Sequence, residues 1–321
     1  MKRREFVGAA FALSCLPAAT AAQPAGKVFR VGWLDFSSAA ENLGIFEQAM
    51  AARGWISGKT YRIEYRGGEG KVERLATIAD DLVRLHVDVL VAPGTPEALA
   101  AKKATATVPI VVVGVDDPVE RGLVSNLARP GANVTGLANA GKDLNAKMLS
   151  LFREIVPRAS SVAVLWDSTD PAHRVVASQL QVAARSIGLQ VNLVQVQRHT
   201  DVEPAFASVR KQGNPMVVVL PSGMLTPRWV ADLALRNALP LASTSAGYAY
   251  EGGLLAYTED WNAVFDRVAS MVDRILKGAK PGDLPVELPA KFKLVVNART
   301  AQALGLTIPA SILLRADHVI S

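Results

Sequence analysis

Three junctions in the sequence place a capping residue directly before a proline, where a predicted strand gives way to a predicted helix. They are Thr95-Pro96, Asp170-Pro171 and Thr226-Pro227. Thr and Asp cap helix N-termini, and proline favours the first helical position. A helix start presents free backbone N–H groups and the positive end of the helix dipole, which suit a carboxylate or a phosphate. Capping alone is the simpler interpretation of any one junction, but their recurrence favours a shared ligand cleft.

Small polar and aromatic residues follow the same predicted strand ends. Hydroxyls at these positions can donate hydrogen bonds to a ligand without adding charge. The candidate contacts of a bound solute are Phe36, Ser37, Ser38, Gly94, Thr95, Pro96, Ser168 and Ser222.

Carboxylates at further strand ends are candidates for binding an ammonium group. Asp116, Asp167 and Glu251 are the three alternatives, whereas Asp117 precedes Pro118 and is better explained as part of a turn. Tyrosine rings combine an apolar body with a polar tip, so they suit the wall of a ligand site. We expect Tyr248 and Tyr257 to cover the apolar part of a solute and Trp166 to belong to the core.

The sequence motifs of catalysis fail when they are checked. Residues 54–60 resemble a phosphate-binding loop but are one residue short and follow a predicted helix. Residues 68–70 begin a dinucleotide fingerprint that has Glu73 in place of its third glycine. No Gly-x-Ser-x-Gly motif occurs, and the four histidines lack metal-ligand spacing and are expected at the surface or at helix ends. We therefore expect no enzyme, no cofactor and no metal site.

The N-terminal residues have the pattern of an export signal. Residues 2–4 are basic, residues 6–16 form an apolar run too short to span a membrane, and residues 18–22 are small. Arg3-Arg4 also resembles a twin-arginine signal. We expect residues 1–22 to be removed near residues 21–23 and the mature protein to act in the periplasm. Lipoprotein processing at Cys15 is a weaker alternative, since Ala12 stands where a lipobox has leucine.

Composition is that of a folded globular protein. Half of the 321 residues are hydrophobic and 20% are charged. The net charge of +6 includes no run of five basic residues, so nucleic acid is not an expected partner. The single cysteine, Cys15, lies in the signal, which excludes disulfides and thiolate chemistry from the mature chain.

Apolar strands alternate with amphipathic helices along the rest of the chain, and this pattern predicts two doubly wound, Rossmann-like α/β lobes. Strands are expected at residues 28–34, 61–65, 87–92, 110–113, 133–137, 161–166, 190–196, 216–220, 241–243 and 253–257. Helices are expected at residues 40–53, 72–85, 96–105, 145–156, 172–187, 202–212, 227–237, 262–276 and 298–304. Residues 285–296 are expected to be mostly extended.

Several longer motifs resemble the ABC-transporter substrate-binding proteins of the tryptophan-binding, TrpX-like group. They cover residues 80–96, 117–119, 122–136, 275–281, 283–287 and 303–309. The chain departs from that group at Ser222-Gly223, where relatives often have Asp-Asn, and at Ala132, where glycine is common.

The resemblance implies a type I periplasmic-binding-protein fold, with two lobes joined by a three-strand hinge. Lobe one would hold residues 28–137 and 253–280, and lobe two residues 138–252 and 281–321. The crossings would then fall near residues 137–138, 252–253 and 281–285.

The resemblance also implies the function of a monomeric periplasmic component of an ABC importer. Such a protein captures a small solute and delivers it to an inner-membrane permease with its ATPase. The resemblance does not carry over the ligand, and our hypothesis is a small organic anion or zwitterion, either an amino acid or an aromatic acid. The solute carboxylate would meet the Thr95 helix start and Ser37 and Ser38, while Asp116 or Asp167 would take an ammonium group. A periplasmic sensor that presents its closed form to a membrane receptor is the alternative.

Overall fold

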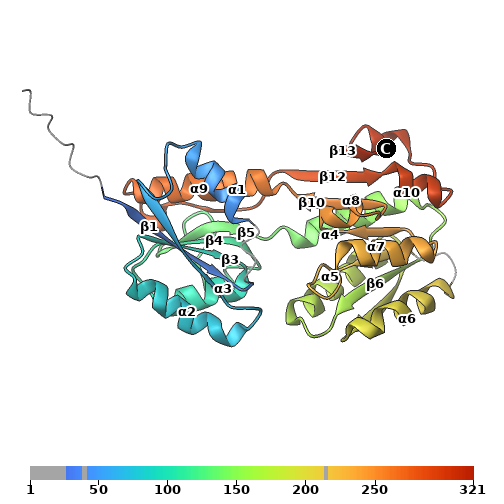
Figure 1. Ribbon diagram of the computed structural model, residues 1–321, viewed down its shortest axis with the longest axis horizontal. Coiled ribbons are helices and arrows are strands. Elements are labelled where there is room, and N and C mark those ends of the chain that lie inside the picture. Colours follow the sequence, from blue (N-terminus) through green and yellow to red (C-terminus); the bar gives the residue numbers. More distant parts are fainter. Residues whose placement is uncertain (1–26, 38–41, 213–215) are drawn as a thin grey trace, which may run out of the picture.

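The computed structural model describes residues 27–37, 42–212 and 216–321, so the expected signal peptide and Ser38 lie outside the described residues. The described chain forms two lobes, each built on a mostly parallel sheet with helices on both faces (Figure 1). The predicted fold class, two doubly wound α/β lobes, is confirmed.

Lobe one is built on a six-stranded sheet in the order β11-β5-β4-β3-β1-β2. Its strands are β1 (Phe29–Asp35), β2 (Tyr61–Gly67), β3 (Val89–Pro93), β4 (Ile110–Val115), β5 (Val134–Ala138) and β11 (Val286–Glu287). Its helices are α1 (Leu43–Ala51), α2 (Val72–Arg84), α3 (Thr95–Ala104), α9 (Trp261–Leu276) and the short 3₁₀ turn η1 (Pro281–Asp283). All its strand pairs are parallel.

Lobe two is built on a seven-stranded sheet in the order β13-β12-β10-β9-β8-β6-β7. Its strands are β6 (Ser161–Asp167), β7 (Gln190–Val196), β8 (Met216–Val219), β9 (Leu241–Ser243), β10 (Leu255–Glu259), β12 (Phe292–Asn297) and β13 (His318–Ile320). Its helices are α4 (Gly141–Ile155), α5 (Pro171–Ser186), α6 (His199–Arg210), α7 (Pro227–Arg236), α8 (Ala246–Tyr250), α10 (Ala298–Ala303) and α11 (Ala310–Leu313). Only β10 and β12 pair in antiparallel fashion among these described strands.

The central strands are apolar along their length because both faces of each sheet are covered. The first four residues of β3 and all four of β8 are buried. Such continuous burial is typical of parallel strands between two helix layers. In lobe one, α1 and α9 pack on one face and α2 and α3 on the other.

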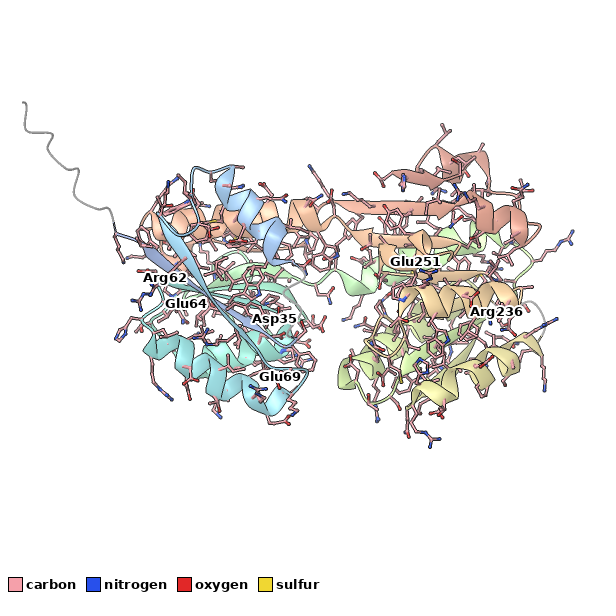
Figure 2. All side chains as sticks on the ribbon, viewed as in Figure 1. Asp35, Arg62, Glu64, Glu69, Arg236 and Glu251 are labelled. Carbon is pink, nitrogen blue, oxygen red and sulfur yellow. The ribbon has the colours of Figure 1, made fainter. Side chains whose placement is uncertain are left out.

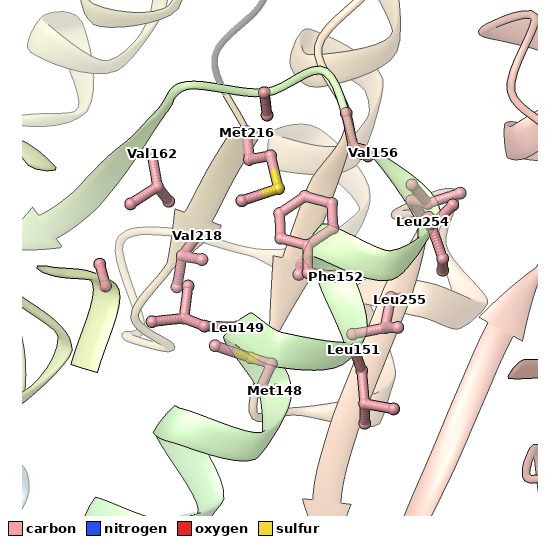
Figure 3. Close-up of a cluster of buried hydrophobic side chains, with 14 of the residues drawn as sticks. Met148, Leu149, Leu151, Phe152, Val156, Val162, Met216, Val218, Leu254 and Leu255 are labelled. Atoms are coloured by element: carbon pink, nitrogen blue, oxygen red, sulfur yellow. The ribbon is translucent and has the colours of Figure 1, made fainter. Parts of the chain in front are cut away.

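Each face of the lobe-two sheet also has its own core. Phe152 of α4 and Val218 of β8 belong to the core shown in Figure 3, together with Leu254 and Leu255. Helices α6 and α7 enclose a second core on the opposite face, around Phe206. Two independently filled cores make each lobe rigid, so the connections between the lobes are where relative motion is expected.

Within the described residues the chain passes between the lobes three times. It crosses after β5, between β10 and α9, and between β11 and β12, and α9 and β12 bridge the two lobes along the top of Figure 1. The first crossing follows β5, which ends at Ala138.

The other two crossings differ from the expected lobe boundaries. The sequence boundaries put β10 in lobe one, but it pairs with β9 and β12 in the lobe-two sheet, so the second crossing lies near Asp260 and not near residues 252–253. Strand β11 pairs with β5 of lobe one, which moves the third crossing from residues 281–285 to residues 288–291. Strand patterns show where strands lie but do not show which sheet they join.

Four short elements are absent from the sequence prediction. They are α8, α11, β13 and η1, each five residues or shorter, and such lengths give no measurable periodicity. In the part of the chain that the structure describes, no helix has the length and apolarity needed to cross a bilayer.

Candidate functional site

The carboxyl ends of the parallel strands in both lobes lie at the crossings. Strand β5 leads from this edge of lobe one into α4, and β10 leads from the same edge of lobe two into α9. Figure 2 shows Asp35, at the end of β1, on the side of lobe one that faces lobe two. Ligands of open α/β sheets bind outside the carboxyl ends of the strands, so the cleft between the lobes is the candidate site.

A cavity of about 160 Å³ lies at the hinge end of this cleft. Both lobes and the third crossing contribute to its lining, which comprises Asp116, Asp117, Asn139, Ala140, Gly141, Lys142, Asp143, Gln179 and Leu288. The lining combines carboxylates, amides and one ammonium group, so it suits the polar end of a small solute.

Asp116 is held in place at this cavity by two neighbouring elements. Its carboxylate Oδ1 accepts a hydrogen bond from Asn139 Nδ2 at 2.8 Å, and its backbone N–H donates to Thr95 Oγ1 at 3.0 Å. Asn139 Oδ1 accepts the Gly141 N–H at 2.7 Å. The half-buried Asp116 carboxylate keeps acceptor capacity, and its role as the partner of a ligand cation stays a prediction.

Asp117 adopts the turn that the sequence suggests. Its φ of 40° lies in the left-handed region, which Asp tolerates better than most residues, and Arg121 N–H donates to its carbonyl oxygen at 3.0 Å. Lys142 Nζ lies 3.8 Å from its carboxylate, across the interlobe cavity.

The start of α3 differs from the expected arrangement in one important respect. Thr95 is the first helical residue and Gly94 is the N-cap, so the Thr95 hydroxyl does not cap the helix and accepts the Asp116 amide instead. Pro96 is exposed in the first turn. The carboxylate of Glu97 lies at this helix start, where its Oε1 accepts the Phe36 N–H at 3.0 Å.

Burial raises the pKa of Glu97 to about 7, against the opposing effect of hydrogen bonds from its own backbone amide and from Phe36, while the Asp35 charge raises it further. The Glu97 side chain is only 4% exposed. A carboxylate of the chain therefore already lies at the α3 start, the position predicted from the sequence for the carboxylate of a solute.

The segment after β1 forms a polar edge of the cleft. Asp35 Oδ1 accepts hydrogen bonds from the Ser37 amide at 2.9 Å and from its hydroxyl at 3.1 Å. Tyr65 donates its hydroxyl to the Ser37 carbonyl at 3.2 Å, and Phe36 is exposed beside it. Phe36 and Ser37 follow the carboxyl end of β1 and are exposed, and their contact with a solute stays a prediction.

In lobe two, the end of β6 is organised around Asp167 and His173. The Asp167 carboxylate accepts the Thr169 amide at 2.9 Å and the Thr169 hydroxyl at 2.6 Å, and Asp167 is 7% exposed. His173 lies at the start of α5, a helix end as expected, and is buried there: its Nδ1 accepts the Asp167 N–H at 3.2 Å and its Nε2 donates to the Pro221 carbonyl at 3.1 Å. Asp167 is therefore committed to a turn, which makes Asp116 the better candidate for a ligand cation.

The hydroxyls of lobe two also make bonds within the lobe. Ser168 Oγ donates to the Val196 carbonyl at 3.3 Å, and Ser222 Oγ accepts the Leu225 N–H at 3.3 Å. Asp170 directly precedes α5, and Thr226 is the N-cap of α7 but makes no side-chain capping bond. Two of the three predicted junctions in the sequence thus lie at the cleft edge of lobe two.

The prediction that Tyr248 covers the apolar part of a solute is wrong. Its side chain is 1% exposed within the α6–α7 core, and its hydroxyl donates to the Leu225 carbonyl, so it cannot wall a cleft in this conformation. Burial also raises the pKa of the Tyr248 hydroxyl above the ordinary tyrosine value. Tyr257 is half-buried on β10 and stacks on Phe292, with ring centroids 5.7 Å apart.

Glu251 lies away from the candidate cleft. It follows α8, which runs from the carboxyl end of β9 back to the amino end of β10, and its side chain is exposed there (Figure 2). Trp166 is 7% exposed in the α4–α5 core, as expected. Among the described residues no cluster of His, Cys, Asp and Glu could hold a metal ion.

Three residues near the cleft were not singled out from the sequence: Glu97, Asn139 and Glu259. Glu259 ends β10 and is 7% exposed, and burial raises its pKa while a hydrogen bond from the Ala140 N–H lowers it. It thereby joins the first crossing to the second. Glu97 lies on the buried face of a predicted helix, and this position was the one sequence feature that could have identified it as a site residue. Nothing in the sequence marks Asn139 or Glu259.

Comparisons with known proteins agree with this architecture. The family model described as ABC transporter substrate binding protein matches residues 34–320. The chain is 26% identical over 265 residues to a tyrosine-binding protein of Clostridioides difficile (strain R20291), a match that covers 81% of this chain and 75% of that one.

Two solved structures cover nearly the whole chain. One is a conserved domain protein from Vibrio cholerae, with 26% identity, a TM-score of 0.78 and coverage of 91% of this chain and 100% of that one. The other is an ABC domain in complex with L-Trp from Streptococcus pneumoniae, with 24% identity, a TM-score of 0.78 and coverage of 92% and 100%. Both share the fold of this chain.

Proposed function

Because the chain belongs to the family of ABC transporter substrate-binding proteins, we propose that it captures a small organic solute between its lobes and delivers it to an inner-membrane permease. The family is one of solute-binding proteins and not of enzymes. The observation that carries the proposal is the polar cavity at the hinge, which takes residues from both lobes and so changes shape when the lobes move. A ligand that touches both lobes stabilises the closed form over the open one.

The proposed solute is a zwitterion of amino-acid size. Asp116 offers a positioned carboxylate to an ammonium group at the hinge end of the cleft. The relatives support this class, since one is named a tyrosine-binding protein and another is described with bound L-Trp. An aromatic amino acid is therefore the first solute to test.

The proposed place of action is the periplasm. Substrate-binding proteins of ABC transporters are typically exported, and residues 1–22 have the composition of a cleavable signal. We propose that the mature chain binds its solute as a monomer, with one solute per cleft. Closure would then present the permease with a surface that only the loaded protein has.

A thermal-shift screen of the mature protein against the twenty amino acids and a set of aromatic acids tests the proposal. A true solute at 100 times its dissociation constant adds about 2.7 kcal/mol of stability, a shift of several degrees for a chain of this size. Asp116→Asn should weaken the binding of an amino acid at least tenfold, or about 1.4 kcal/mol, since a charged hydrogen bond is lost.

Asp80→Asn is the matched control. Asp80 is exposed on α2 and does not line the cavity, so this variant also removes a carboxylate but should keep the affinity of the wild type. A screen in which no solute shifts the melting temperature would contradict the proposed function. Equal loss in both variants would remove Asp116 from its proposed role.

A further inference from the structure

The start of α3 is filled by a side chain of its own first turn. Glu97 is the third helical residue, and its carboxylate folds back so that Oε1 accepts the Phe36 N–H at 3.0 Å. Its own backbone amide also donates to this carboxylate. The Glu97 carboxylate thus occupies the position at which a helix start binds an anion.

Gly94 makes this position of the carboxylate possible. A Cβ on Gly94 would lie 2.4 Å from Glu97 Oε2, and the residue has a φ of 104°, which glycine adopts at little cost. A side chain at position 94 would displace the carboxylate from the helix start. Gly94 and Glu97 therefore act together to place a negative charge beneath the Phe36–Ser37 edge of the cleft.

The surroundings of Glu97 are acidic. No described cation forms an ion pair with it, and the Asp35 carboxylate acts on it from β1. Asp116 follows the neighbouring strand β4 and is connected to the same helix start through Thr95. A second carboxylate brought here from solution would meet like charges at short range in a partly buried setting, where repulsion is weakly screened.

We propose that Glu97 is a specificity-determining residue: its carboxylate is an internal anion that fills the α3 start and excludes the carboxylate of the solute from lobe one. The inference rests on the proposed function and deepens it. Lobe one then receives the cationic or uncharged end of the solute, and the solute carboxylate is held by lobe two. Monocarboxylate zwitterions fit this arrangement, whereas dicarboxylates do not.

The Glu97 carboxyl is only partly ionised at neutral pH. Burial and the Asp35 charge raise its pKa to about 7, so a nearby cation favours the ionised form and an added anion opposes it. A solute ammonium at the lobe-one edge therefore stabilises the charge that excludes a carboxylate.

Acetate is the probe that tests the inference without knowledge of the solute. We would titrate acetate into the ¹⁵N-labelled mature protein at pH 8, where Glu97 is mostly ionised, and follow the backbone amide resonances of Phe36 and residue 97. Glu97→Ala empties the helix start, and Glu97→Gln keeps it filled without the charge. Equal additions of sodium chloride control for ionic strength.

In Glu97→Ala, acetate should shift both resonances and saturate, with an affinity at least about tenfold higher than in the wild type, a difference of about 1.4 kcal/mol. The wild type and Glu97→Gln should show no saturable shift. Saturable binding of acetate to these amides in the wild type would overturn the inference, and so would its absence in a folded Glu97→Ala variant. If Glu97→Ala fails to fold, the test uses Glu97→Gln and the wild type. A saturable acetate shift in either protein overturns the inference. No saturable shift in both proteins supports it.

The two proposals fail in distinguishable ways. The acetate titration reports only on the α3 start, so it can succeed while the solute screen finds no ligand. Conversely, acetate binding to the wild-type α3 start would overturn the inference about Glu97. The proposed function would still stand if the screen finds a solute.

Discussion

The hydroxyl of Thr95 accepts the backbone N–H of Asp116 at 3.0 Å, and this bond joins the first residue of α3 to the segment that follows β4. Two residues that the sequence nominates separately as ligand contacts are therefore one unit. Thr95 positions Asp116, and Asp116 presents its carboxylate to the cavity at the hinge. This relationship makes the role of Thr95 indirect, and it predicts how substitutions at that position behave.

Thr95→Val keeps the shape of the side chain but leaves the Asp116 amide without its acceptor. We expect a loss of stability of about 1 kcal/mol and a several-fold loss of solute affinity, because Asp116 is no longer held. Thr95→Ser is the control and should keep both properties near those of the wild type. Chemical denaturation and calorimetric titration measure the two effects, and unchanged affinity in Thr95→Val would separate Thr95 from the site.

Stability should depend on pH through Glu97. Its pKa is raised from the ordinary glutamate value of 4.5 to about 7 in the folded protein, so the folded state binds the proton more tightly than the unfolded state. The resulting stabilisation is complete below pH 4.5 and is lost as the pH rises through 7, and it amounts to roughly 3 kcal/mol. Urea unfolding between pH 5 and pH 8 measures it.

Glu97→Gln isolates this contribution from those of other groups. Glutamine does not titrate, so the difference in unfolding free energy between wild type and variant should change steadily across this pH window. Glu259, whose pKa burial also raises, contributes equally to both proteins and cancels in the comparison. A pH-independent difference would mean that the Glu97 carboxyl has an ordinary acidity.

Tyr248→Phe should lower stability without touching solute affinity. The variant leaves the buried Leu225 carbonyl without a donor, which costs about 1–2 kcal/mol. Tyr257→Phe, at a half-buried position, should cost less. Measured dissociation constants of both variants should match the wild type; a large loss of affinity in Tyr248→Phe would mean that the Tyr248 hydroxyl takes part in solute binding.

Gly136→Ala should be severely destabilising because β5 passes very close to β4. A Cβ at Gly136 would lie 2.0 Å from the Val112 carbonyl oxygen, so the strands would have to separate beside the first crossing. We expect a loss of at least about 3 kcal/mol. Gly44→Ala is the control, since it lies in α1 with open space around it and should be as stable as the wild type or more so. Equal melting temperatures of the two variants would contradict this interpretation of β5.

The sequence predicts the fold well because each lobe repeats a strong local pattern. Runs such as that of β4 alternate with amphipathic helices such as α2, and both signals are set by residues close together in the chain. The lobe membership of β10 and β11 could not be predicted in this way, because it depends on pairing between strands that are distant in sequence.

The candidate site is predicted only in part, for a related reason. Strand ends identify Asp116 and Thr95 as cleft residues, but the bond between them depends on the packing of β4 beside β3. Tyr248 looks like a pocket residue because it follows a strand, yet the α8 helix turns its ring into the core. Glu97 looks like an ordinary acidic residue of a first helical turn, and only its burial reveals a charge at the helix start.

Native mass spectrometry of the protein, purified from its producing cells, tests the central claim most directly. We predict that one small molecule is released per chain on mild denaturation, with the mass of a monocarboxylate zwitterion such as an aromatic amino acid. If the protein proves empty, the same instrument should detect a one-to-one complex after an amino-acid mixture is added. A chain that neither carries nor takes up any such solute would contradict the claim that this protein captures an amino acid between its lobes.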